Sequence, residues 1–283
     1  MPSSTIRGVT LAYEIHGASG PWVALSPGGR RDMDGVRTLA QRVASSGYRV
    51  LIHDRRNCGA SDVSIPDLGE GDPSEYEIWA DDLKALLMQH DALPAIVGGG
   101  SSGCRLSLLF ALRNPQHVRA LLLWRVTGGR FACERLAEQY YGQYIKAAQA
   151  GGMAAVCATE HWRDRIAARP ANRERLMAMD PQRFIAVMEH WRTFFLDGAD
   201  LPVIGCTESD LRSIQAPTVI IPGNDRTHGH AIAAAAHRLI PGSELVDLFP
   251  GDVDIDIVPM EDWQRREDDM SAVLTAFLKR RVT

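Results

Sequence analysis

Short apolar runs alternate with longer segments of mixed character along most of the chain. The runs are almost continuously Val, Ile and Leu, which is typical of parallel strands that are covered on both faces. We predict an early strand at TLAYEIHG (10–17) and a last strand at SELVDLF (243–249). Between them the predicted strands are WVALS (22–26), YRVLIHD (48–54), AIVGGG (95–100), VRALLLWRV (118–126) and PTVIIPG (217–223).

The segments between these runs carry apolar residues at helical spacing. The predicted helices are DGVRTLAQRVASSG (34–47), EYEIWADDLKALLMQHD (75–91), HAIAAAAHRLIPG (230–242) and EDWQRREDDMSAVLTAFLKRR (261–281). The last of these is acidic at its start and basic at its end, as the helix dipole favours. Strands that alternate with helices predict the α/β class, with a mostly parallel sheet flanked by helices.

One long segment departs from this alternation. From residue 128 to 210 the pattern is helical, without intervening strands, and it is rich in aromatic residues, methionine and alanine. We therefore expect residues 1–127 and 211–283 to form the core, and residues 128–210 to form a helical cap.

Composition narrows the class of protein. The 283 residues are 45% hydrophobic and 23% charged, with a net charge of −4, and no basic run indicates nucleic-acid binding. The five cysteines form no CxxC pair, so we expect free thiols and neither a metal nor an organic cofactor. No apolar signal core or run of about 18 apolar residues is present, which predicts a cytoplasmic protein without membrane association. The oligomeric state stays open, a homodimer included.

The stretch AIVGGGSSGCRLSLLFALRNP (95–115) carries the clearest chemistry. It predicts a strand, the turn Gly99-Gly100-Ser101-Ser102-Gly103, and then a helix. This is a G-x-S-x-G nucleophile elbow, in which glycines permit a strained turn that presents the serine. The alternative is a glycine-rich turn that holds a serine by chance.

Here the sequence resembles the α/β-hydrolase superfamily. Members often continue from the elbow serine to an A-L-R-x-P helix end, and ALRNP places Pro115 at the usual spacing from Ser101. That register selects Ser101 over Ser102 as nucleophile. DRRNCGASD (54–62) is similar to the family's D-x-R-G-x-G-x-S-D loop, with Asn57 in place of a glycine.

The resemblance also implies an oxyanion hole and a catalytic acid. SPGGR (26–30) stands where the family has its His-Gly turn, so the oxyanion donors would be the backbone N–H of Ser102 and of Gly28 or Gly29. Asp225 in VIIPGNDRTH stands in the place of the family acid. Alternatively, Asp225 only caps the following helix.

The family's catalytic histidine is missing from its usual place after the last strand. LFPGDVDIDIVPMEDW (248–263) contains no histidine but has Asp252, Asp254 and Asp256. His228 is the leading candidate for a relocated base, a substrate contact being its alternative. A tether of only three residues from Asp225 argues against a triad. A buried carboxylate of the acidic loop is a further candidate base, because burial raises its pKa.

These features predict a serine-nucleophile hydrolase of a small ester, lactone or carbon–carbon-bonded ketone, whose partner is a small-molecule substrate. From the cap we expect substrate contacts by His161, Trp162, His190 and Trp191. The alternative for the tryptophans is the hydrophobic core of the cap. The alternative functions are a ligand-binding protein or a lyase of the same fold without a working triad.

Overall fold

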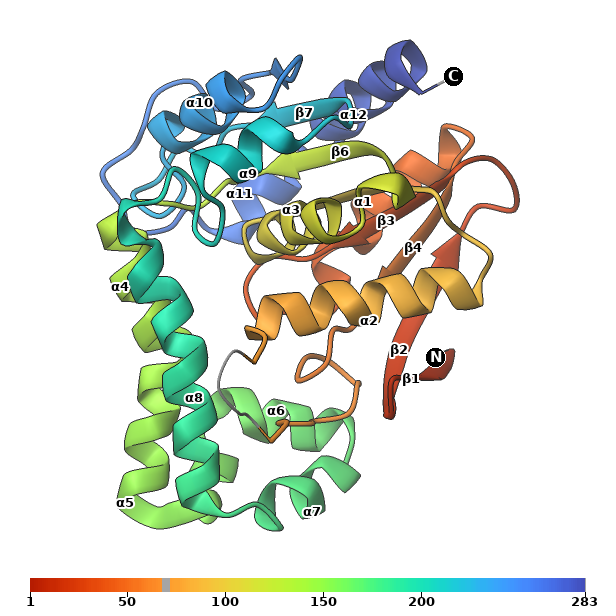
Figure 1. Ribbon diagram of the computed structural model, residues 1–283. Helices are drawn as coiled ribbons and strands as arrows, with labels where there is room; N and C mark the ends of the chain where they lie inside the picture. The colour runs from red at the N-terminus through yellow and green to blue at the C-terminus, as the bar shows by residue number, and fades with distance from the viewer. Residues whose placement is uncertain (68–71, 283) are drawn as a thin grey trace.

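The computed structural model describes residues 1–67 and 72–282, and these form an eight-stranded sheet with helices on both faces (Figure 1). The strand order is β1-β2-β4-β3-β5-β6-β7-β8. β1 and β2 are antiparallel to their neighbours, whereas all pairings from β4 to β8 are parallel. The predicted fold class is confirmed. The bounds are β1 Ser3–Ile6, β2 Val9–His16, β3 Trp22–Ser26, β4 Arg49–His53, β5 Ala95–Gly100, β6 Val118–Trp124, β7 Thr218–Ile221 and β8 Glu244–Leu245.

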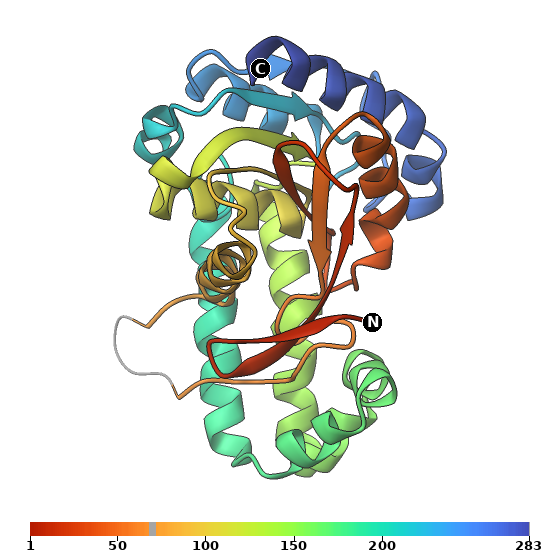
Figure 2. The same cartoon turned by 90° about the vertical axis from the view of Figure 1, so that its right-hand side faces the viewer.

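Helices cover both faces of the sheet, which explains the continuously apolar strands. Along β6, Leu121 and Leu123 enter one core and Leu122 enters the other. Successive strand residues point to opposite faces, so each residue needs an apolar partner. α1 (Asp34–Ser45) and α12 (Glu267–Arg281) lie together on one face, and the other face carries α2 (Glu75–Gln89), α3 (Ser102–Arg113) and α10 (His230–Leu239) (Figure 2).

Residues 125–217 contain no β-strand. Their helices are α4 (Arg130–Ala137), a π-helical segment (Glu138–Gly142), α5 (Gln143–Ala158), α6 (Glu160–Ala168), α7 (Ala171–Met177), α8 (Pro181–Leu196) and α9 (Glu208–Ser213). α4, α5 and α8 form an arm that projects from the sheet, with α6 and α7 at its far end (Figure 1). We refer to α4 through α8 as the helical arm.

Three elements differ from the sequence prediction. β1 was not predicted, and β8 has two residues instead of the seven expected at 243–249. β8 is an edge strand paired only with β7, so nothing on its outer side extends the ladder. The single helix expected at 261–281 is divided into α11 (Met260–Gln264) and α12. Three acidic residues in the first turn of α12 stabilise the new helix start.

All five cysteines are buried free thiols, as expected. Among residues 1–67 and 72–282, no helix is long and apolar enough to cross a membrane. Within the same residues, no group of three or more His, Cys, Asp or Glu side chains is arranged to hold a metal ion.

Candidate active site

Ser101 lies at a sharp turn between β5 and α3. Its backbone has φ 53° and ψ −110°, a region that costs a non-glycine residue free energy. The flanking glycines are required by close packing. A Cβ on Gly103 would lie 2.1 Å from the carbonyl oxygen of Ser26, and one on Gly99 would lie 2.5 Å from Gly103. The predicted strained elbow is therefore confirmed.

The loop after β7 brings Asp225 and His228 to this elbow. His228 Nε2 lies 2.9 Å from Ser101 Oγ, and His228 Nδ1 lies 2.8 Å from Asp225 Oδ1. The objection that three residues are too short a tether is wrong. The chain turns tightly, with His228 N donating to the Asp225 carbonyl at 3.0 Å, and this turn leaves the imidazole facing both partners.

Asp225 is held by donors on both carboxylate oxygens. Oδ1 also accepts from the backbone N–H of Thr227 and His228, and Oδ2 accepts from Val258 N and from Arg125 Nη2 at 3.1 Å. Burial alone would raise the pKa of Asp225, but these bonds and the nearby cations lower it to about 2. The N-cap of α10 is Gly229, so Asp225 does not cap that helix.

His228 is buried beside the same arginine, Arg125. Burial, followed by the charge of Arg125 3.4 Å from Nδ1, lowers the pKa of His228 to about 4, although Asp225 opposes the shift. The imidazole is consequently neutral near pH 7. With Nδ1–H donating to Asp225, Nε2 is free to accept a proton from Ser101.

The acidic side chains of the loop after β8 are exposed, so none of them is the buried carboxylate considered as an alternative base. Residues 251–257 are exposed; Asp252 bonds to His230, and Asp256 pairs with Arg226 at 3.0 Å. Thr227 N and Oγ1 both donate to the Asp256 carbonyl. Asp252 and Asp256 thus face His230, Arg226 and solvent. Residues 251–257, where the histidine was expected, therefore support the loop after β7 that carries His228.

The Gly28–Gly29 turn faces the elbow. A Cβ on Gly28 would lie 3.2 Å from the carbonyl oxygen of Gly100 and 3.4 Å from Ser101 Cβ, so the turn packs closely against the elbow. Arg55 Nη2 holds the turn by donating to the carbonyls of Gly29 and Arg31. Ser102 begins α3, so its backbone N–H has no acceptor within the helix. These residues surround the position expected for an oxyanion.

The loop of residues 54–62, which follows β4, has an asparagine where the family has a glycine. Asn57 has φ 66°, a conformation that asparagine tolerates better than most residues. Its side chain donates to Glu75 and accepts from Ser64 N. These two bonds offset the backbone strain that glycine would avoid.

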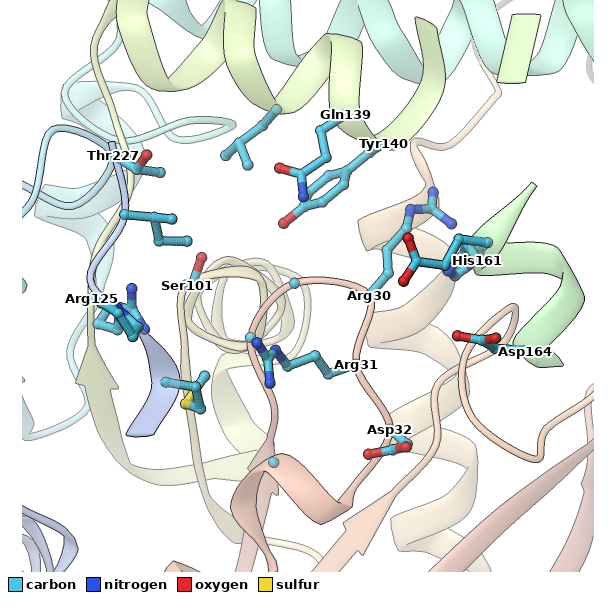
Figure 3. Close-up of a pocket in the computed structure, with 18 of the residues that line it drawn as sticks. Arg30, Arg31, Asp32, Ser101, Arg125, Gln139, Tyr140, His161, Asp164 and Thr227 are labelled. Carbon is cyan, nitrogen blue, oxygen red and sulfur yellow. The ribbon is translucent and has the colours of Figure 1, made fainter. Parts of the chain in front are cut away.

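Ser101, His228, Gly28 and Gly29 line a cavity of about 620 Å³ (Figure 3). The helical arm supplies its opposite wall; its contributions are Leu136, Gln139, Tyr140, Gln143, Tyr144, Glu160, His161, Asp164 and Arg165. The expected cavity between Ser101 and the helices of residues 128–210 is present.

Of the four substrate contacts expected from these helices, only His161 lines this cavity. Trp162 and Trp191 are each 1% exposed and pack in the core of the helical arm, so the expectation is corrected for both. His190 does not line the cavity either, and its ring instead contacts the carbonyl of Asp72 at 3.0 Å. Helical periodicity alone did not show that one face of α6 meets the cavity and that α8 supplies none of its lining.

Sequence reasoning also missed Arg125, which has φ 52° and donates to Asp225. The signal that could have found it is an arginine at the carboxyl end of a buried apolar strand.

Comparison with known proteins agrees with this fold. Residues 15–125 match the model of the α/β hydrolase fold family. The chain has the α/β-hydrolase fold. It is similar to an enol-lactonase from Burkholderia xenovorans LB400 (TM-score 0.65, 18% identity, covering 98% of this chain and 100% of that one). It is also similar to a meta-cleavage product hydrolase from Pseudomonas fluorescens IP01 (TM-score 0.66, 17% identity, 99% and 98%).

A sequence relative is the uncharacterized hydrolase YraK of Bacillus subtilis (strain 168). It is 32% identical over 117 residues, which are 41% of this chain and 41% of YraK. The chain thus aligns with about two fifths of that relative's length. The α/β-hydrolase fold that the resemblance implied is therefore confirmed.

Proposed function

We propose that the protein is a serine-nucleophile hydrolase of a small ester, lactone or carbon–carbon-bonded ketone. The observation that carries the proposal is the continuous chain of contacts from Ser101 Oγ through His228 to Asp225. A serine hydroxyl becomes an effective nucleophile when a neighbouring base accepts its proton. The triad is non-standard because acid and base share the loop after β7.

With an ester, Ser101 Oγ attacks the carbonyl carbon while its proton moves to His228 Nε2. Negative charge develops on the carbonyl oxygen, where the N–H of Ser102 and of Gly28 or Gly29 would stabilise it. Asp225 stabilises the transient imidazolium. His228 then protonates the departing alcohol, leaving an acyl group on Ser101.

Water completes the cycle. It loses a proton to His228 Nε2 and attacks the acyl carbon, and the returning proton restores Ser101 as the carboxylic acid leaves. A base with a pKa near 4 accepts a proton less readily than ordinary imidazole. We therefore expect slow turnover of generic esters.

A fluorophosphonate probe tests this proposal, since it phosphonylates only an activated serine. The wild type should acquire one adduct on Ser101, measured by mass spectrometry of peptides. His228→Ala should slow labelling by about 10²–10⁴-fold. His117→Ala is the matched control, because His117 is outside the cavity and has no side-chain bond among the described contacts. A folded wild type that resists the probe would favour the ligand-binding alternative.

A further inference from the structure

Arg31 is an uncompensated cation in the cavity wall. Its side chain is exposed and lines the same cavity as Ser101. Within residues 1–67 and 72–282, its guanidinium has no ion pair, hydrogen bond or ring contact, although its main chain bonds to Gly28 and Arg55. Most arginines of this protein, by contrast, pair with a carboxylate. Arg31 is thus available to a ligand.

The other cations of the cavity wall are already engaged. Arg125 pairs with Asp225, and Arg30 forms a buried ion pair with Glu75. Arg165 donates to the carbonyl oxygen of Arg30 at 3.1 Å, although no carboxylate pairs with it among the described residues. Each of these three arginines thus makes a side-chain contact inside the protein, whereas the guanidinium of Arg31 makes none among the described residues.

The acidic residues that line the cavity are Asp32, Asp34, Glu160 and Asp164. Figure 3 shows the guanidinium of Arg31 directed toward Ser101 and Arg125 at the left, whereas Asp32 and Asp164 lie to its right. Asp34 is engaged by Arg37 of its own helix. The charge of Arg31 also helps lower the pKa of Arg125, which agrees with their placement. Arg31 thus adds a positive charge on the side of the cavity that holds Ser101.

We propose that Arg31 binds an anionic group of the substrate, so that the substrate is a carboxylate-bearing ester, lactone or ketone. This inference rests on the proposed function. Guanidinium and carboxylate match in charge and in hydrogen-bond geometry. An exposed ion pair is worth little in water, but a substrate that fills the cavity displaces solvent from both groups. Arg31 is a specificity-determining residue in this scheme.

The test compares two esters that differ only in charge. One is 4-nitrophenyl hydrogen glutarate, with a free carboxylate, and the other is its methyl ester. Wild-type kcat/KM should be higher for the anionic ester by about tenfold or more. Arg31→Gln should lower kcat/KM for the anionic ester by about 10- to 100-fold and for the neutral ester less than about threefold. Arg31→Lys should retain part of the preference.

Arg173→Gln is the matched control. Arg173 is an exposed arginine of α7, outside the cavity, with no ion pair among the described contacts, and its loss should change neither rate. Equal loss on both esters in Arg31→Gln would overturn the inference, because it would indicate damage to the Gly28–Gly29 turn. Measurable but equal wild-type rates on both esters would overturn it as well, while leaving the hydrolase function intact.

Binding to Ser101→Ala separates the inference from the proposed function. Calorimetry should show monomethyl glutarate binding at least about tenfold more tightly than dimethyl glutarate, and Arg31→Gln should abolish the difference. This holds even if the wild type hydrolyses neither nitrophenyl ester, a result that would count against the hydrolase alone. No preference for the anion in Ser101→Ala would overturn the role of Arg31.

Discussion

Acidification should test the state of His228 in the free enzyme. Its pKa is lowered from the ordinary 6.5 to about 4, which corresponds to about 3 kcal/mol in favour of the neutral imidazole. A general base must be neutral to accept the serine proton. On a neutral nitrophenyl ester, kcat/KM should therefore stay constant as the pH falls through 6.5, where an ordinary histidine would lose half its activity.

The same burial limits how far the pH can be lowered. Below pH 6.5 the unfolded chain protonates its imidazoles, whereas the folded chain keeps His228 and His53 neutral; burial lowers the pKa of His53 to about 3. Their contribution to stability is complete above pH 6.5 and is lost as the pH falls toward 4. At pH 4 each costs about 3 kcal/mol, a large part of the ~5–15 kcal/mol of a typical domain. Asp225, with its lowered pKa, loses its contribution only below its ordinary value of 3.8.

The assay combines kcat/KM from pH 8 to 4 with far-ultraviolet circular dichroism at each pH. Activity should persist down to the pH at which the helical signal is lost. Arg125→Gln removes a cation that disfavours the imidazolium, so its activity should decline at higher pH than that of the wild type. Half-maximal wild-type activity near pH 6.5 in a fully folded sample would refute the reasoning.

Three other substitutions test the elbow and the position of the base. Ser102→Ala keeps the backbone N–H and should lower esterase kcat only modestly, whereas an effect as large as that of removing the nucleophile would show that the register is misassigned. Gly103→Ala places a Cβ 2.1 Å from the Ser26 carbonyl oxygen and should lower the free energy of unfolding by more than about 1–3 kcal/mol. The measurement is a fall of several degrees in Tm, and an unchanged Tm would contradict the packing. Asp252→His in the His228→Ala background should restore no activity, since residue 252 is exposed and directed to α10; recovered turnover would show that the loop can reach the serine.

The sequence predicted the fold well because its signals are local. Each strand of the sheet centre carries apolar side chains for two cores, and the elbow needs glycine at two fixed positions. The short edge strand β8 and the divided C-terminal helix were mispredicted. Both outcomes depend on what lies beside the element in the folded chain, which a run of apolar residues does not specify.

The site was predictable in part. Ser101 was predicted as the nucleophile from the glycine pattern of its turn, and Asp225 was predicted as the acid from its place after a strand. The contact with His228 was doubted, because the direction of a side chain three residues away depends on the backbone turn between them. Trp162 and Trp191 were expected at the cavity because aromatic side chains suit both cores and pockets. Only tertiary packing decides between the two environments.

The loop after β7 places Asp225 and His228 three residues apart on one segment. Because Oδ1 of Asp225 binds the backbone and the ring of the same histidine, their mutual contact is set within the run DRTH, while Arg125 and Val258 hold Asp225 from outside it. A fold in which these two residues come from separate loops must keep two segments in register through evolution. The pattern D-x-x-H after a buried strand is therefore a signature to search for in sequences that lack a late histidine.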